Sequence, residues 1–380
     1  MQDARGSGPV PLVLRAEEAE VARVMTICNA CRYCEGFCSV FPAMERRLDF
    51  VHGDIHFLAN LCHNCGACLE ACQYAAPNAF NVNVPRSLSA VRELTYEDYA
   101  WPQALSVLYR RQGLWLAFGT MVSLAIVLGL AAFFSTSRTG STEAAFYAVI
   151  PHRVMVLVFG AVALWIVLAF AIGATRFWRG LPAKPARVAM TAASGEAIRN
   201  SLTLRYLDGG GAGCNQANDA PTHARRRFHH VTFYGFIACF AATLVATFYH
   251  YVLQLPAPYA LTSLPVLLGT TGGVGLIVGP IGLWWLHGRR PAERGDPRQK
   301  TMDRGFIALL IATSVTGLVL LIVRATPAMP SLLVIHLAIV LALFLSLPYG
   351  KFAHAVYRVA ALLKDAIENR QPSTMTLKLD

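Results

Sequence analysis

Two stretches of the sequence decide the fold of the N-terminal quarter: Cys28-Asn-Ala-Cys-Arg-Tyr-Cys-Glu-Gly-Phe-Cys38 and Cys62-His-Asn-Cys-Gly-Ala-Cys-Leu-Glu-Ala-Cys72. Each has the spacing C-x2-C-x2-C-x3-C, and together they contain eight of the ten cysteines. Three thiolates spaced in this way wrap around one four-iron cube, and in two-cluster ferredoxins the fourth cysteine of each run binds the other cube. We therefore predict two [4Fe–4S] clusters with crossed ligand sets, namely Cys28, Cys31, Cys34 and Cys72 for the first and Cys62, Cys65, Cys68 and Cys38 for the second.

The two runs depart from the ferredoxin pattern at one point. Ser39 and Gln73 stand where a proline directly follows the fourth cysteine in ferredoxins. The alternative is a pair of zinc sites, but zinc prefers two C-x2-C pairs separated by a longer insert. Because the surrounding sequence shows little alternating strand pattern, we predict a mostly helical ferredoxin-type domain over residues 21–100, after a flexible N-terminus at 1–20.

The rest of the chain has the composition of a membrane protein. Apolar residues make up 55% of the 380 residues and charged residues only 14%, against roughly 25% charged in an average globular domain. Six apolar stretches follow Trp101, and each is close to the ~20 residues that a helix needs to cross the hydrocarbon core. We therefore predict an all-α membrane protein with six transmembrane helices in residues 101–360 and a tail at 361–380. The stretches are roughly 114–134, 154–175, 231–253, 264–286, 305–323 and 332–350.

The positions of Lys and Arg predict the orientation of these helices. Nine lie between the second and third apolar stretches, six between the fourth and fifth, and five after the sixth, whereas the other three connections hold two, none and one. Positive charge stays on the cytoplasmic side, so the clusters, both termini and the 176–230 loop are predicted to be cytoplasmic. The first apolar stretch begins near Leu114, too late for a signal peptide, which agrees with a multi-pass protein of the bacterial inner (cytoplasmic) membrane. This placement also explains the net charge of +11 without a nucleic-acid partner.

Four histidines near the ends of the predicted helices form two candidate pairs. His229 and His250 are 21 residues apart and point to nearly the same side of one helix, and His336 and His354 are five whole turns apart on another. Antiparallel helices would bring His229 level with His354 and His250 level with His336, which suits haem b held by two axial histidines. The alternative is that these are interfacial histidines that contact lipid head groups. The substitutes, should a pair be wrong, are His152, His230 and His287.

Several remaining features carry less information. Cys239 lies in an apolar stretch and reads as a small buried residue, and Cys214 has no neighbouring ligand pattern. The glycines at 209–213 follow no predicted strand, so a flexible or docking loop is favoured over a phosphate-binding one. No convincing dinucleotide-binding fingerprint is found, since the glycines at 269–275 lie inside an apolar stretch. An electron donor to the clusters is therefore expected to be a separate polypeptide.

Four segments resemble the citrate/tricarballylate-utilization protein B family, and the resemblance runs from about residue 20 to 370. The C-terminal half is also similar in plan to the haem-bearing gamma subunit of respiratory nitrate reductase. The family resemblance implies an iron–sulfur membrane protein that reoxidises a soluble FAD-dependent dehydrogenase of tricarballylate or a similar tricarboxylate and passes electrons to the quinone pool. The segments are Cys31-Arg-Tyr-Cys-Glu-Gly-Phe-Cys, Leu58-Ala-Asn-Leu-Cys-His-Asn-Cys-Gly-Ala-Cys, Arg226-Arg-Phe-His-His and Leu347-Pro-Tyr-Gly-Lys-Phe.

Three functions compete on the sequence alone. The leading interpretation is an electron-transfer, quinone-reducing subunit of an oxidoreductase system rather than a stand-alone dehydrogenase. The alternative is a tricarboxylate transporter whose cluster domain senses redox state, although the apolar stretches contain almost no charge for an anionic substrate. A heterodisulfide-reductase-like enzyme would need further cysteine-rich modules, and only Cys214 and Cys239 remain.

Overall fold

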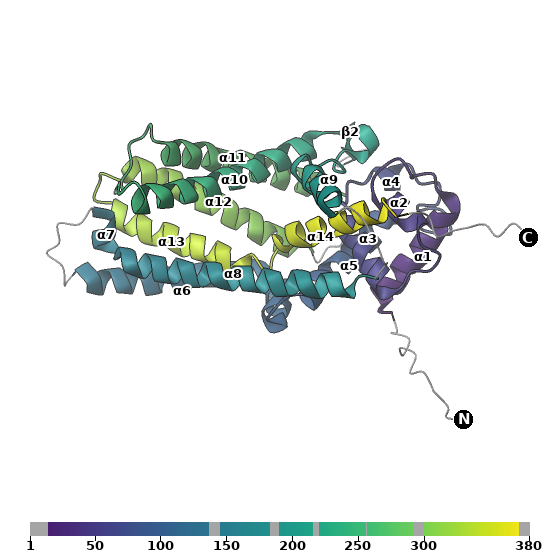
Figure 1. The fold of residues 1–380 in the computed structure, drawn as a ribbon, viewed down its shortest axis with the longest axis horizontal. Coiled ribbons are helices and arrows are strands. Elements are labelled where there is room, and N and C mark those ends of the chain that lie inside the picture. The colour runs from purple at the N-terminus through teal and green to yellow at the C-terminus, as the bar shows by residue number, and fades with distance from the viewer. Residues whose placement is uncertain are drawn as a thin grey trace, which may run out of the picture.

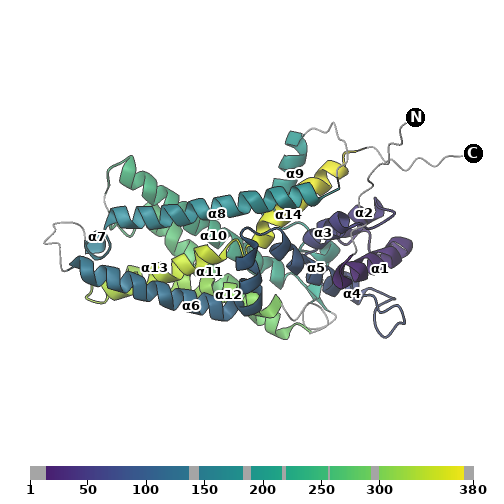
Figure 2. The ribbon, with the colours of Figure 1, turned by 90° about the horizontal axis from the view of Figure 1, so that it is seen from below.

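The computed structural model describes residues 14–136, 145–182, 190–215, 220–255, 257–291 and 299–371. Its shape is elongated, with a bundle of long helices at one end and the N-terminal domain at the other (Figures 1 and 2). The last helix reaches from the bundle into the N-terminal domain in both views. Most of the flexible stretch predicted at residues 1–20 lies outside the described residues, and the first helix begins at Ala16.

The N-terminal domain is helical, as the sequence predicts. Side chains that are fully buried, such as Met25, Phe57 and Leu88, form its core. The cysteine runs span helix ends and the turns beside them, where Arg32 and Gly66 have positive φ values of 56° and 87°. Such turns expose backbone amides and fold the chain back around one point. The helices are α1 (Ala16–Cys31), α2 (Val40–Glu45), α3 (His52–Leu61), α4 (Ala67–Glu70) and α5 (Val84–Asp98).

Five helices of the bundle are long and apolar enough to cross a membrane. They are His152–Gly180, Ala224–Tyr251, Leu264–Arg289, Met302–Val323 and Met329–Ser346, which match the last five predicted stretches. The first predicted stretch falls in α6 (Gln103–Thr136), where the segment Phe118–Gly129 is apolar but shorter. The six-helix count therefore stays a prediction. The remaining elements here are α7 (Ala145–Val149), α8 (His152–Gly180), α10 (Ala224–Tyr251), α11 (Leu264–Arg289), α12 (Gln299–Val323) and α13 (Met329–Ser346).

Apolar side chains on the outside of the bundle support a lipid environment. Leu157 and Leu164 on α8 are 73% and 70% exposed, and Ile322 on α12 is 78% exposed. In water such a surface would be a large liability, whereas hydrocarbon solvates it well. The outer face of the bundle is therefore suited to contact lipid.

Helices α10 and α11 pack unusually closely because glycines line their contact. A Cβ atom added to Gly235 would lie 3.0 Å from the carbonyl oxygen of Gly272, and one added to Gly279 would lie 2.6 Å from the backbone nitrogen of Thr232. Small residues allow this approach of helix backbones in membranes. Cys239 sits in the same contact, with its Sγ 4.0 Å from the carbonyl oxygen of Gly269, and the packing accounts for it as a small residue.

The predicted 176–230 loop is structured on both sides of residues 183–189, which are not described. It contains α9 (Met190–Leu202), a short 3-10 helix η1 (Gly209–Gly211), and a two-stranded antiparallel sheet of β1 (Cys214–Asn215) and β2 (Pro221–Thr222), with Cys214 opposite Thr222. The predicted tail begins inside α14 (Ala353–Glu368), which is largely buried, and residues 372–380 lie outside the described part. Helix α14 contacts α3, α8 and α9 and so joins the two ends of the molecule.

Candidate functional site

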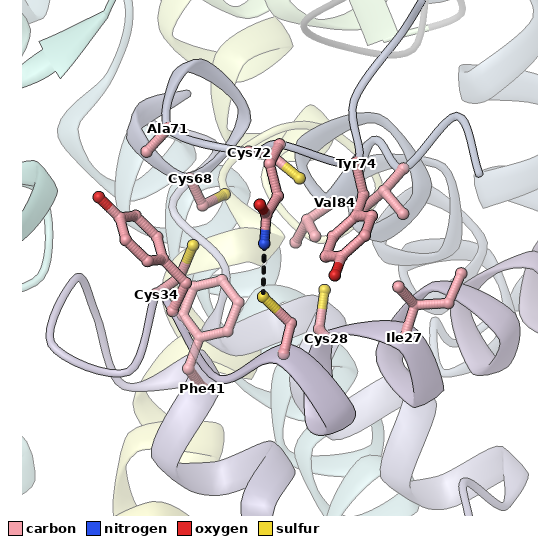
Figure 3. A pocket seen from close by; sticks show the side chains of 13 residues that line it. Ile27, Cys28, Cys34, Phe41, Cys68, Ala71, Cys72, Tyr74 and Val84 are labelled. Carbon is pink, nitrogen blue, oxygen red and sulfur yellow. Dashed lines mark hydrogen bonds between the residues drawn. The ribbon is translucent and has the colours of Figure 1, made fainter. Parts of the chain in front are cut away.

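The first predicted cysteine set lines one pocket of about 270 Å³ in the N-terminal domain. Figure 3 shows Cys28, Cys34 and Cys72 with their sulfur atoms turned toward a common space, and Cys31 also lines it. Burial and the neighbouring thiols raise the pKa of Cys28 and of Cys34 to about 12. A bound metal displaces thiol protons, and the convergence of these four thiols on one pocket is compatible with a metal cluster.

Gln73, which replaces the proline of the ferredoxin pattern after the fourth cysteine, makes a hydrogen bond to the first cysteine run. Its Nε2 atom donates to the Sγ atom of Cys31 at 3.9 Å, the contact that Figure 3 marks with a dashed line. A proline at this position would have no such donor. The residue after the fourth cysteine therefore contributes a hydrogen bond to the other run.

The second predicted set is gathered deeper in the domain. The thiol of Cys68 has Cys38, Cys62 and Cys65 as its charged neighbours, and burial raises its pKa and that of Cys38 well above the ordinary value. Cys34 of the first set is also a neighbour of both Cys38 and Cys68, so the two sets adjoin. The structure thus brings together both crossed sets, and their role as ligands remains a proposal.

Four arginines contact the segment Cys62–Asn64, which begins at the first cysteine of the second run. Two of them, Arg92 and Arg358, donate to the carbonyl oxygen of Cys62. Arg358 also contacts Nδ1 of His63, and burial together with this guanidinium lowers the pKa of His63. The other two bind Asn64: Nη1 of Arg225 donates to its carbonyl oxygen at 2.5 Å, and Nη2 of Arg290 donates to its Oδ1 atom at 2.5 Å.

These arginines also line a cavity of about 400 Å³ that begins at His63 and extends between α10, α11, α12 and α14. Its walls in the bundle are apolar, with Phe233, Phe236 and Phe306 among them, while its other end carries a cluster of charge. Ligand cavities of cofactor size are typically ~300–1,000 Å³ and mostly apolar, with a few convergent polar groups. The charged residues are Arg92, Arg225, Arg290, Lys351, Arg358 and Asp303.

The charge of this cavity is unbalanced among the described residues. Five cations face one carboxylate, and that carboxylate, on Asp303, pairs with Nζ of Lys351 at 2.8 Å. Burial and the nearby Arg225 lower the pKa of Arg290 to about 9. Buried charge is costly unless it is paired, so the cavity is built for an anion.

Two histidines face one another on the wall of this cavity. The ring centroids of His229 and His354 are 6.2 Å apart, and the ring planes are nearly perpendicular at 84°. This separation leaves room for one metal ion at about 2 Å from a nitrogen of each ring. Nδ1 of His354 lies against the carbonyl oxygen of Lys351 and must carry the proton there, which leaves Nε2 with a free electron pair. Nδ1 of His229 is buried without a hydrogen-bond partner among the described residues.

The other predicted histidines have separate surroundings. His250 stacks on His152 with ring centroids 4.4 Å apart, and Nε2 of His152 bonds the hydroxyl of Tyr251 at 3.0 Å. His336 instead shares a 2.9 Å hydrogen bond between its Nδ1 and the hydroxyl of Thr316. The structure therefore brings together His229 and His354, whereas His250 and His336 each contact a different partner. The prediction that His336 and His354 share one helix is wrong, because α13 ends at Ser346 and His354 lies in α14. Of the remaining substitutes, His230 packs on Tyr234 and His287 lines the cavity.

Cys214 is a residue of this region that sequence reasoning did not connect with a site. It is completely buried and packs with Leu204 and Leu207 against Cys65 of the second set. The backbone nitrogen of Asn215 donates to the carbonyl oxygen of Cys65 at 3.1 Å. No local spacing could reveal this contact, because Cys214 follows the cysteine runs by more than a hundred residues.

A buried polar network joins α1, α3 and α5 on the side of the N-terminal domain that meets the bundle. One carboxylate oxygen of Glu18 lies 3.0 Å from Nε2 of His56 and 3.1 Å from Nδ1 of His52, and Nδ1 of His56 lies 2.7 Å from the hydroxyl of Tyr99. Arg15 pairs with the same carboxylate at 2.7 Å. These donors lie within reach of a metal ion, but Arg15 already neutralises Glu18, so a hydrogen-bonded support is the simpler interpretation.

Comparison with known proteins relates nearly the whole chain to one group. Residues 107–375 match the family described as Citrate utilization protein B, and residues 21–108 match the one described as Citrate utilization protein B Fer4-like domain. The chain is 55% identical over 364 residues to the Citrate utilization protein B of Escherichia coli, with 94% of each chain covered. No solved structure matches it. The Fer4-like match indicates an iron–sulfur role for the N-terminal domain, and the apolar helices indicate a membrane protein.

Proposed function

The chain belongs to the citrate utilization protein B family, and we propose that it carries electrons from a separate FAD-dependent dehydrogenase to membrane quinone. The dehydrogenase would be a soluble cytoplasmic enzyme that acts on tricarballylate, citrate or a similar tricarboxylate. The chain would lie in the bacterial inner membrane with six spans, and its cluster domain and both termini would face the cytoplasm. In this role it is the quinone-reducing subunit of an oxidoreductase system.

One observation carries the proposal: the candidate cofactor sites are contiguous. The first cysteine set lines an open pocket, the second set adjoins it through Cys34, and the segment after Cys62 forms the wall of the histidine cavity. When bound at these sites, two [4Fe–4S] clusters and haem b supply one-electron transfer. Cys28, Cys31, Cys34 and Cys72 would hold the first cluster, and Cys38, Cys62, Cys65 and Cys68 the second.

The histidine cavity fits haem b in three independent ways. His229 and His354 would hold the haem iron, and the proton on Nδ1 of His354 is fixed by the backbone carbonyl of Lys351, which leaves its Nε2 able to bind. The aromatic walls suit a flat apolar ring. The cationic end would pair with the two carboxylates that haem b carries, and Arg225 and Arg290 bind Asn64 there. Arginine is well suited to carboxylates because its guanidinium offers two parallel donors.

The same cations favour one alternative function. A tricarboxylate is also a small anion, so a transporter could use Arg225, Arg290 and Lys351 to bind its substrate. That function leaves the facing histidines and the adjoining cysteine sets without a role. It is tested by uptake of labelled citrate into proteoliposomes that contain this chain alone, for which we expect no uptake above empty vesicles.

The test of electron transfer begins with the protein purified in detergent. Iron and acid-labile sulfide should each approach about eight per chain from the clusters, with one further iron from haem, and a reduced-minus-oxidised spectrum should show haem b bands. A short-chain quinone added to the dithionite-reduced protein should reoxidise it. Protein without iron and sulfide would overturn the proposal, and clusters without haem would remove the haem from it.

A further inference from the structure

The segment from Leu204 to Asn215, which we term the cover, lies over both cysteine runs. A Cβ atom added to Gly210 would lie 3.1 Å from the Cα atom of Phe37, and one added to Gly209 would lie 3.2 Å from the Cβ atom of Ala67. Both glycines also have positive φ values, 81° and 59°, which residues with a side chain rarely adopt. The glycines that read as a flexible loop in the sequence instead let the cover approach the second cysteine set closely.

A backbone hydrogen bond and a strand pairing position the end of the cover beside Cys65. The backbone nitrogen of Asn215 donates to the carbonyl oxygen of Cys65 at 3.1 Å, and β1 pairs with β2, where Cys214 stands opposite Thr222. A Cβ atom on Gly213 would lie 2.7 Å from the backbone of Thr222. The thiol of Cys214 is therefore held in place rather than free to turn away from the site.

The thiol of Cys214 has two acceptors within reach. It lies 3.8 Å from the carbonyl oxygen of Leu207, and the buried cluster that contains Cys214 packs against Cys65. Its single proton serves one acceptor at a time. A hydrogen bond to an ionised acceptor is roughly twice as strong as one between neutral groups, so a thiolate on Cys65 draws the proton of Cys214 toward it.

We propose that Cys214 is a positioning residue that donates its S–H to the sulfur of Cys65 and thereby raises the reduction potential of the second cluster. The inference rests on the proposed function, because it requires a cluster at Cys38, Cys62, Cys65 and Cys68. Hydrogen bonds to cluster sulfurs help to set reduction potentials, since a donor stabilises the more negative, reduced state. Together with the arginines on Cys62 and Asn64, this donor would favour electron flow from the first cluster toward the second.

The competing role for a fifth cysteine is that of a ligand. Four thiolates complete a [4Fe–4S] cluster, and the structure gathers four without Cys214. If Cys214 were a ligand in place of Cys65, its removal would cost the second cluster its iron. If it is a donor, the iron stays and only the potential changes.

The experiment is a potentiometric titration of full-length, detergent-purified protein followed by electron paramagnetic resonance, with iron measured on each sample. Cys214→Ala should retain all cluster iron and shift the midpoint potential of the second cluster downward, while the first cluster is unchanged. Cys214→Ser, which keeps a donor, should shift less. Cys239→Ala, which removes the other cysteine outside the two runs, is the matched control and should not shift either potential. A Cys28→Ala protein, lacking the first cluster, assigns the remaining signal to the second.

The possible results distinguish a failure of the donor role of Cys214 from a failure of the proposed electron-transfer function. An unshifted potential in iron-replete Cys214→Ala protein overturns the donor role, and so does loss of about half of the cluster iron, which would make Cys214 a ligand. Wild-type protein without cluster iron overturns the proposed function, and this inference with it.

Discussion

The imidazole ring of His354 lies across the cavity from that of His229, with 6.2 Å between the ring centroids and 84° between the ring planes. The two residues come from α14 and α10, which the chain brings together at the boundary between bundle and cluster domain. Different contacts position the two rings. Nδ1 of His354 bonds the carbonyl oxygen of Lys351, and α10, which carries His229, packs closely against α11. Both side chains are therefore held in this arrangement by contacts within the protein.

We expect His354→Ala and His229→Ala each to abolish the haem b bands, because one remaining imidazole cannot complete the axial pair. Cluster iron should stay near eight per chain, since neither residue is one of the proposed cluster ligands. The matched control is His230→Ala, which changes the neighbouring residue on α10, a histidine that packs on Tyr234. Optical spectra of the three variants decide the question, and unaltered haem bands in His354→Ala protein would remove this pair from the site.

Arg290→Gln should weaken haem binding by about 10- to 100-fold. Its guanidinium is buried at the cationic end of the cavity, and a hydrogen bond to a charged group contributes about 1.5–3 kcal/mol. The control is Arg289→Gln, because Arg289 instead lies over the ring of Trp285 at 4.0 Å. Haem loss to excess apomyoglobin measures the difference, and equal loss rates in the two variants would contradict a role for Arg290 as an anion partner.

The crossed ligand sets predict a specific pattern in double variants. Cys28→Ala combined with Cys72→Ala removes two ligands of one cluster and should leave about four cluster irons per chain. Cys28→Ala combined with Cys38→Ala removes one ligand from each cluster and should leave almost none. Iron and sulfide assays distinguish the cases, because an uncrossed arrangement would give the reverse result.

Acid should destabilise the cluster domain through the network around Glu18. Burial lowers the pKa of His56 to about 4 from its ordinary 6.5, and hydrogen bonds from Arg15 and His56 outweigh burial and lower the pKa of Glu18 to about 2 from 4.5. A lowered pKa in the fold means that stability is full above the unfolded value and is lost as pH falls toward the folded value. The stability that depends on His56 is therefore lost as pH falls from 6.5 to about 4, and the stability that depends on Glu18 is lost from 4.5 to about 2.

The corresponding variant is His56→Gln, which cannot titrate in this range. Between pH 7 and 4.5, the titration of His56 should lower the free energy of unfolding of the wild-type protein by on the order of 2 kcal/mol. Thermal unfolding at a series of pH values measures this loss, and the variant should show a flatter pH profile. Parallel profiles would mean that another group controls the acid transition.

The ion pair between Arg47 and Glu368 should contribute strongly to the junction of the two domains. Glu368 contacts Arg47 at 2.9 Å, both side chains are buried, and Arg47 also binds Asp54. Glu368→Ala leaves a buried guanidinium short of a partner, which costs about 3–5 kcal/mol. Glu196→Ala is the control, because it breaks a more exposed pair with Arg370 on the neighbouring surface and should cost no more than about 1 kcal/mol. Urea unfolding of the two variants measures both effects.

The sequence predicted those features that follow from local spacing. Five spans follow from runs of apolar residues, and the helical Fer4-like domain follows from the cysteine runs. The meeting of His229 and His354 was predicted from antiparallel helices, but the whole-turn spacing of His336 and His354 did not apply, because the helix breaks between Ser346 and Ala353. The cavity with its five cations was not predictable, because its residues come from seven separate segments of the chain. Cys214 was missed for the same reason, since only tertiary folding places it on Cys65.

Helix α14 has a consequence for how the protein is made. It supplies His354 and Arg358 to the cavity and Glu368 to the N-terminal domain, yet it follows all the predicted spans along the chain. The two cysteine runs are translated before the predicted spans. Arg358, which contacts Cys62, and Glu368, which pairs with Arg47, are translated only after them. If the cavity holds haem as we propose, α14 must be present for it to bind, and a chain truncated before residue 353 would lack the His354 and Arg358 walls of the cavity.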